Sequence, residues 1–224
     1  MLEENLRRIE EKIAEAAIKS GRKREDITLV AVTKKVDVKT AQDLLSLGVK
    51  NLGENRVQVL LEKYDVIKND AIWHLIGHLQ TNKVKYIADK VSLIHSVDSL
   101  KLLEEINQRA GNVGKIQEVL LEVNISGEES KFGISAREAD EFASQMENFK
   151  NVKLKGLMTI APIPLEAGAN RKYFCAMKEL YENLAQKKYS NVSMEHLSMG
   201  MSMDFEDAIV EGANIVRIGT SLFA

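Results

Sequence analysis

Two short turns near the end of the chain hold residue types that bind phosphate groups. The stretch HLSMGMSMD fills positions 196–204, and RIGTSLFA closes the chain at positions 217–224. The first turn opens a helix-like segment, whose free N–H groups and positive dipole end suit a phosphate dianion. Gly200 and Gly219 would let the backbone approach that phosphate closely. We therefore expect a site for a phosphorylated ring cofactor here.

Ordinary helix capping is the alternative explanation for these turns. Ser202 or Asp204 can cap the helix that follows, and Asp204 with Asp207 resembles a capping box. Arg217 lies inside the last apolar run, where an isolated buried charge is very expensive. It either forms an outward salt bridge to a helix or donates to a ring nitrogen or an anion in the mouth of the fold.

A pair of lysines follows the first apolar run. Lys34 and Lys35 stand directly after LVAVT, at positions 29–33. Burial lowers the pKa of an amine, and a neutral amine is a nucleophile toward aldehydes. Both lysines could instead extend from the strand end into solvent. Period-2 alternation leaves open which lysine points inward, because both faces of the run are apolar.

The rest of the chain repeats a short β-branched run, a polar turn and a helical pattern. The apolar runs predict eight strands, at 28–33, 50–53, 72–77, 92–97, 117–125, 154–160, 192–198 and 214–219. Helical periodicity predicts helices between them, at 38–47, 55–68, 80–89, 98–110, 135–149, 168–189 and 203–211. This alternation favours parallel strands, and eight units favour a (β/α)₈ TIM-type barrel over a doubly wound open sheet.

No linker or shift in composition divides the chain, so we expect one domain over residues 1–224. Residues 1–21 predict an amphipathic helix that packs on the barrel. Its apolar positions at helical spacing are Leu2, Leu6, Ile9, Ile13 and Ala17. Because this helix is charged throughout, it is unlike a signal peptide.

The charge balance gives no reason to expect nucleic acid or an anionic membrane as a partner. Lys and Arg number 31 against 33 Asp and Glu, for a net charge of −2. No apolar run approaches the roughly 20 residues that span a bilayer. Cys175 is the single cysteine, which excludes an internal disulfide and fits a reducing compartment. We therefore expect a cytoplasmic protein.

The four histidines and one loop lysine have no clear role from sequence alone. His74 and His196 lie in apolar runs and are expected to be structural. His78 and His95 lie near strand ends, but no spacing of Asp, Glu, Cys or His predicts a metal site. Lys131, in the KFG stretch at 131–133, belongs either to a lid or to a plain turn.

Seven motifs follow one another along the chain: AVTK, GENRVQ, WHLIGHLQTNK, HSVDS, GLMTIAP, SMGMSMD and RIGTSLF. In this order they resemble the YggS/PROSC family of pyridoxal 5′-phosphate (PLP) homeostasis proteins, over nearly the whole chain. That family is similar to the barrel domain of alanine racemase and other fold-type III enzymes. The sequence departs from the family in KKVD, which lacks a proline after the lysine, and in its ending LFA. Neither departure touches an expected contact.

The resemblance implies a role for several residues. Lys34, rather than Lys35, would form the internal aldimine, a Schiff base with PLP. Arg217 would face the pyridine nitrogen. The other implied cofactor contacts are a phosphate site and pocket walls, made by Ser202, Gly219, Thr220, Asn55, Met199 and Met201.

The implied function is PLP homeostasis, meaning storage, buffering or delivery of the cofactor, with little or no turnover. A cationic arginine disfavours protonation of the ring nitrogen and so weakens the ring as an electron sink. All five tyrosines fall in helical segments, which leaves no second acid/base group of the racemase kind. Apo PLP-dependent enzymes would receive the cofactor. We expect a monomer, because no racemase-like dimer domain is evident.

Two enzyme readings remain open at this point. A fold-type III racemase or decarboxylase needs an acid/base group opposite Lys34, for which only His78, His95 or Lys131 are available. A class I aldolase-type barrel shares the phosphate site, but it expects its lysine on a later strand and no coloured cofactor.

Overall fold

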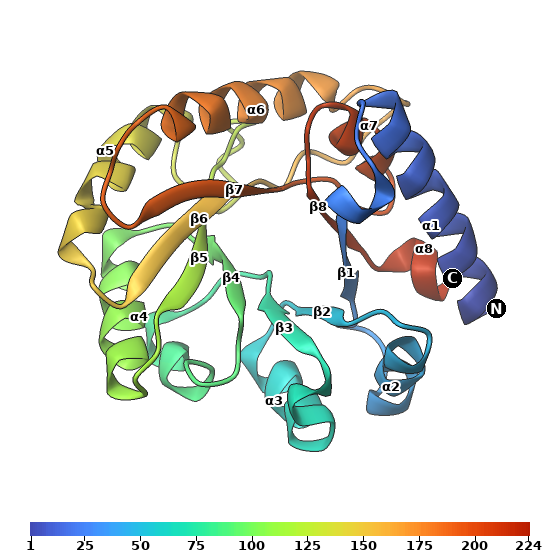
Figure 1. The fold of residues 1–224 in the computed structure, drawn as a ribbon, viewed down its shortest axis with the longest axis horizontal. Helices are drawn as coiled ribbons and strands as arrows, with labels where there is room; N and C mark the ends of the chain where they lie inside the picture. Colours follow the sequence, from blue (N-terminus) through green and yellow to red (C-terminus); the bar gives the residue numbers. More distant parts are fainter.

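The computed structural model describes residues 1–224 and contains a closed barrel of eight parallel strands (Figure 1). The strands are β1 (Thr28–Val32), β2 (Asn51–Glu54), β3 (Ile72–Leu75), β4 (Leu93–Val97), β5 (Gln117–Glu122), β6 (Val152–Met158), β7 (Val192–Ser198) and β8 (Ile215–Ile218). Each strand pairs with the next along the chain, and β8 closes the ring by pairing with β1. The predicted barrel is confirmed, and the open sheet is excluded.

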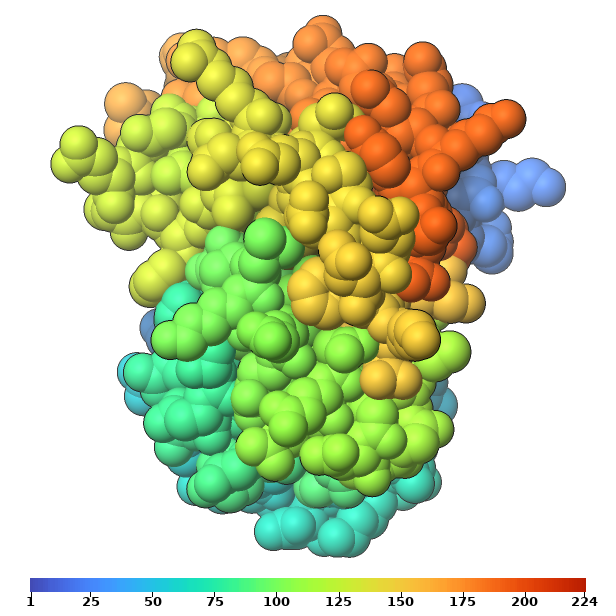
Figure 2. Space-filling view, turned by 90° about the vertical axis from the view of Figure 1, so that its left-hand side faces the viewer, coloured from blue at the N-terminus to red at the C-terminus, as the bar shows by residue number.

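Helices surround the barrel and connect its strands. The α-helices are α1 (Leu2–Lys19), α2 (Val38–Ser46), α3 (Val57–Ile67), α4 (Leu100–Asn112), α5 (Ala139–Ser144), α6 (Arg171–Ala185), α7 (Phe205–Val210) and α8 (Thr220–Phe223). Figure 2 shows one side of the molecule, where teal and green segments form the lower part of the surface and yellow and orange segments the upper part. None of the helices combines the length and the apolar character needed to cross a membrane.

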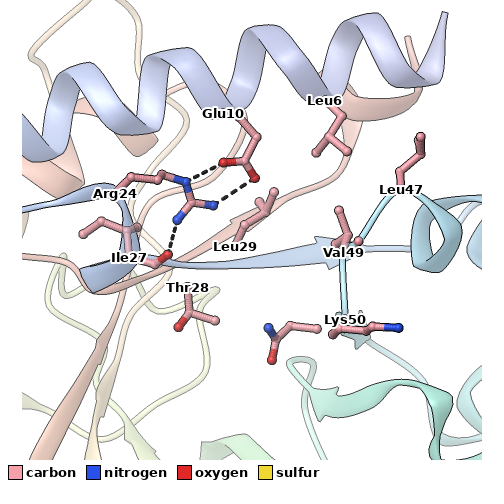
Figure 3. A pocket seen from close by; sticks show the side chains of 11 residues that line it. Leu6, Glu10, Arg24, Ile27, Thr28, Leu29, Leu47, Val49 and Lys50 are labelled. Carbon is pink, nitrogen blue, oxygen red and sulfur yellow. Dashed lines mark hydrogen bonds and ion pairs between the residues drawn. The ribbon is translucent and has the colours of Figure 1, made fainter.

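The predicted N-terminal helix is confirmed as α1, which lies beside α7 and α8 (Figure 1). The Asn5 side chain on α1 donates to the carbonyl of Leu222 at 3.2 Å, which ties the helix to the end of the chain. Arg24, just before β1, donates through Nη2 to Glu10 of α1 at 2.9 Å (Figure 3). These contacts hold α1 against the β8–β1 side of the barrel.

Apolar side chains form two separate cores. The larger core contains 50 buried residues and lies between the strands and the surrounding helices. The smaller one fills the barrel interior and consists of Val30, Leu93, Leu120, Met158 and Ile215. Parallel barrel strands are covered on both faces, which is why most of them appear in the sequence as continuous apolar runs.

Two predicted helices differ from the structure. The segment 80–89 contains only a 3₁₀ helix, Thr81–Tyr86, which advances about 2.0 Å per residue against 1.5 Å for an α-helix. The predicted helix 135–149 is broken into two 3₁₀ turns around α5. There, the Ser144 hydroxyl donates to the carbonyl of Glu141, a local bond that competes with helix propagation.

Candidate functional site

A cavity of about 360 Å³ opens at the carboxyl ends of the strands, in the mouth of the barrel. Barrel proteins carry their functional residues at this end. The predicted site residues that line it are Lys34, Asn55, Met201, Ser202, Arg217, Gly219 and Thr220. Met199 does not line it, because its side chain is fully buried in the larger core. We call this space the mouth cavity.

Lys34 lines the mouth cavity, whereas Lys35 does not. The side chains of Lys34 and Lys35 are both exposed, so burial does not distinguish them. What distinguishes Lys34 is its place at the mouth cavity. Its backbone is anchored through Thr33, whose hydroxyl donates to Glu54 Oε1 at 2.5 Å. Lys63 Nζ lies 2.5 Å from the Thr33 carbonyl and 2.6 Å from the same Glu54 oxygen. A buried ion pair therefore fixes the strand end that carries Lys34.

Hydrogen-bond donors from the end of the chain converge on Ser202. Its Oγ accepts from the backbone N–H of Gly219 at 3.2 Å and from that of Ser221 at 3.3 Å. The Ser221 hydroxyl is buried and has no partner. Two backbone N–H groups thus meet the Ser202 hydroxyl, and both Ser202 and Gly219 line the mouth cavity. Such a donor set fits a phosphate group.

The predicted capping role of Asp204 is wrong. Its side chain forms no cap bond to α7 and turns back instead, accepting from Met201 N–H at 2.7 Å and from the Asn170 amide at 2.7 Å. Gly200 has φ +89, and a Cβ there would lie 2.5 Å from Ala208 Cβ on α7. The turn therefore packs too closely on α7 for any other residue, and Asp204 fixes its shape.

Arg217 points into the barrel, so an outward salt bridge to a helix is excluded. Its side chain is 3% exposed and donates to Ser198 Oγ at 2.6 Å and to the Thr159 carbonyl at 2.8 Å. Burial lowers its pKa to about 10, while the negative charges of Glu122 and Asp204 oppose that shift. Both direct partners are neutral. A buried guanidinium whose direct partners are neutral favours a ring nitrogen or an anion as a further acceptor beside it.

The histidines and the loop lysine named from the sequence lie in different surroundings. His78 stacks on Phe132 with ring centroids 4.0 Å apart, and its Nδ1 lies 3.3 Å from Asp98. Lys131 lies 3.4 Å from Glu128. His95 is fully buried, and burial holds its pKa well below its ordinary value. No group of three or more potential ligand side chains is placed to hold a metal ion.

Glu122 is a titratable group that the sequence analysis did not single out. It ends β5, is 4% exposed, and one of its carboxylate oxygens has no partner. Burial raises its pKa to about 7, and the negative charge of Asp98 adds to the rise, while Arg217 opposes it. The signal was present as a glutamate inside the apolar run QEVLLEVNI. In a barrel strand, such a residue faces either the axis or a helix, and both positions are buried.

Glu122→Gln should stabilise the protein above pH 7 and have little effect at pH 5. The Glu122 pKa rises from 4.5 to about 7 on folding, so the folded state keeps a proton that the unfolded state loses between these values. Wild-type stability therefore falls across that window, by up to about 3 kcal/mol at about 1.36 kcal/mol per unit. Urea unfolding at pH 5 and pH 8 measures the difference. The exposed Glu129→Gln serves as control, and an equal effect of Glu122→Gln at both pH values would contradict the assignment.

The fold and the mouth cavity define a barrel of the alanine racemase type, and comparison with known proteins agrees. The family model described as alanine racemase, N-terminal domain, matches residues 2–224. A pyridoxal phosphate homeostasis protein of Aquifex aeolicus is 46% identical over 221 residues, covering 98% of this chain and 96% of the relative. The chain belongs to the pyridoxal phosphate homeostasis protein family, which confirms the resemblance seen in the motifs.

Solved structures with similar folds support the same placement. An unknown protein from Bifidobacterium adolescentis has a TM-score of 0.94 and 33% identity, covering 99% of this chain and 94% of its own. PipY of Synechococcus elongatus, solved with PLP bound, has a TM-score of 0.82 and 31% identity, covering 95% of this chain and 100% of its own. Both comparisons extend over almost the entire barrel.

Proposed function

We propose that this protein binds PLP in the mouth cavity and serves PLP homeostasis by storing, buffering or delivering the cofactor. The observation that carries the proposal is that Ser202 and Gly219 line the same cavity as Lys34, with the N–H groups of Gly219 and Ser221 gathered at the Ser202 hydroxyl. PipY, a relative of known structure, is described with PLP bound.

Each lining residue has a part in this proposal. The Lys34 amine would attach covalently to the aldehyde that PLP supplies when bound. Ser202, Gly219 and Thr220 would hold the phosphate, with Arg217 toward the ring nitrogen. Asn55 and Met201 would form the walls.

Low turnover follows from the charge of Arg217. A guanidinium that keeps its proton disfavours a second positive charge on the ring nitrogen, and the unprotonated ring withdraws electrons less strongly. Even with the pKa lowered to about 10 by burial, Arg217 stays cationic at neutral pH. None of the five tyrosines lines the mouth cavity as a second acid or base.

Delivery requires an accessible mouth, and the loop after β6 supports this. Ile163 lines the mouth cavity and is 79% exposed, and Leu165 close by is 98% exposed. We expect the carrier to act as a cytoplasmic monomer, with PLP-dependent apo-enzymes as recipients.

Absorption spectroscopy with PLP tests the proposal. Wild-type protein should develop a visible band, and borohydride reduction should leave PLP attached to the peptide that contains Lys34. Lys34→Ala should abolish both signals, because no other amine lines the mouth cavity. Lys35→Ala is the matched control and should retain them. A band that survives Lys34→Ala with unchanged intensity would refute the assignment of this lysine.

A further inference from the structure

A continuous chain of hydrogen bonds runs from the mouth cavity through the interior of the barrel. Arg217 on β8 donates to Ser198 Oγ on β7 at 2.6 Å. Ser198 Oγ lies 3.0 Å from His95 Nδ1 on β4. His95 Nε2 lies 3.0 Å from His74 Nδ1 on β3, and His74 Nε2 lies 3.0 Å from Asn51 Oδ1 on β2. Five strands therefore contribute one polar side chain each.

The chain links the two ends of the barrel. Arg217 lines the mouth cavity, and Asn51 lines a second cavity at the amino ends of the strands, the one beside Glu10 and Arg24 (Figure 3). Ser198 and His95 are fully buried, and His74 is 4% exposed. Polar groups buried this deeply need every available partner.

The order of donors along the chain follows from the chemistry of its first member. A guanidinium can only donate, so Ser198 Oγ accepts from Arg217. The single hydroxyl hydrogen of Ser198 then has His95 Nδ1 as its acceptor. A neutral His95 with Nδ1 accepting carries its hydrogen on Nε2, which donates to His74 Nδ1. His74 must in turn carry its hydrogen on Nε2, which donates to Asn51 Oδ1.

The reverse order leaves a buried donor unsatisfied. In that case Ser198 Oγ would accept from both Arg217 and His95, and its own hydrogen would have no acceptor. An unpaired buried donor is rare in folded proteins because its desolvation is not compensated.

The imidazoles carry no charge, so Arg217 is the only charged member of the chain. Burial lowers the pKa of His74 to about 4 and that of His95 well below its ordinary value. The charged or titratable groups that act on the chain from outside are Glu122 and Asp204, near Arg217, and His196, near both imidazoles. None of these forms a hydrogen bond to a chain member.

We propose that Ser198, His95 and His74 are positioning residues for Arg217, joined in a one-directional chain in which both imidazoles are Nε2–H tautomers. The chain fixes the guanidinium through a neutral acceptor, so its positive charge is not offset as it would be by a carboxylate. This leaves the full charge directed at the ring nitrogen of bound PLP, and that part of the proposal rests on the proposed function.

Histidine-selective ¹⁵N NMR of protein without added PLP tests the chain itself. The double variant His78→Gln/His196→Gln removes the two histidines outside the chain. The remaining two rings should both show a protonated Nε2 and an unprotonated Nδ1, unchanged from pH 8 to pH 5. A protonated Nδ1 on either ring in that range would overturn the proposed order.

PLP labelled with ¹⁵N at the ring nitrogen tests the positioning. In wild type and in the control His196→Gln, the nitrogen should stay unprotonated from pH 6 to pH 8. In Ser198→Ala and His95→Leu, the protonated fraction should rise at least tenfold at pH 6. If His95→Leu fails to fold, Ser198→Ala alone still tests the positioning role. A ring nitrogen that stays unprotonated in Ser198→Ala, as in wild type, would overturn that role. If wild type binds no PLP, the proposed function fails. The NMR of the protein without PLP still tests the order of hydrogen bonds from Arg217 to Asn51.

Discussion

Replacing Lys63 with methionine should destabilise the protein by about 3–5 kcal/mol, the range for removing one partner of a buried ion pair. Lys63 is 3% exposed and Glu54 is fully buried, with Nζ 2.6 Å from Oε1. The other Glu54 oxygen already lacks a partner. Without Lys63, the carboxylate keeps only the Thr33 hydroxyl. Urea unfolding at pH 7 measures the loss.

The double variant Glu54→Gln/Lys63→Met is the matched control. A glutamine removes the buried charge and can still accept from the Thr33 hydroxyl, so this protein should recover most of the stability lost in Lys63→Met. Because the pair anchors the backbone next to Lys34, PLP attachment should also slow in the single variant. A double variant as unstable as Lys63→Met would mean that packing, and not the orphaned charge, explains the loss.

Gly156→Ala should destabilise the barrel by at least about 3 kcal/mol, the upper range for forcing extra atoms into a packed interior. Gly156 lies on β6 with φ +151, and a Cβ there would be 1.8 Å from the His196 carbonyl oxygen on β7. The pairing of β6 with β7 shifts register just before this glycine. The two backbones approach so closely that one strand must move, and thermal or urea unfolding should report it.

Gly127→Ala separates the steric effect from the backbone conformation. Gly127 also has a positive φ, +73, but nothing lies within 4 Å of an added Cβ. It should lose only about 1–2 kcal/mol, the cost of a left-handed conformation for a residue with a Cβ. A similar loss in both alanine variants would show that the contact with His196 does not matter.

The close approach of β6 and β7 also affects the site. β7 ends at Ser198, and Thr159 directly follows β6, and these two residues hold Arg217. A strand displaced at Gly156 would therefore move both acceptors of the guanidinium. We expect Gly156→Ala to weaken PLP retention even where enough protein folds to be measured.

The barrel was predictable from the sequence because its signals are local and repeated. Each strand is a short apolar run, and each ends in glycine or polar residues before a helical pattern, so the count and the order of elements follow directly. The same logic placed Lys34, Ser202 and Gly219 at one end of the barrel, since parallel strands present their carboxyl ends together.

Other features depend on contacts between distant residues, and no local pattern reports them. The Asp204 carboxylate turns toward Asn170 instead of capping α7, because a partner 34 positions away competes for it. Met199 lies two residues before Met201, which lines the mouth cavity, yet its side chain belongs to the larger core. His74 was expected to be structural and His95 was placed only near a strand end, whereas the pairing of β3 with β4 brings their rings within hydrogen-bond distance.

The two hydrogen bonds between Ser202 and the last turn bear on how readily the protein would release bound PLP. Without a ligand, the N–H groups of Gly219 and Ser221 already donate to the Ser202 hydroxyl. A phosphate that accepts from these N–H groups would replace the Ser202 hydroxyl as their acceptor. Its release would restore the bonds to Ser202. For these two N–H groups, loading and unloading would then exchange one acceptor for another. Release of PLP would benefit from this exchange, because neither the loaded nor the empty form would leave these two N–H groups without an acceptor.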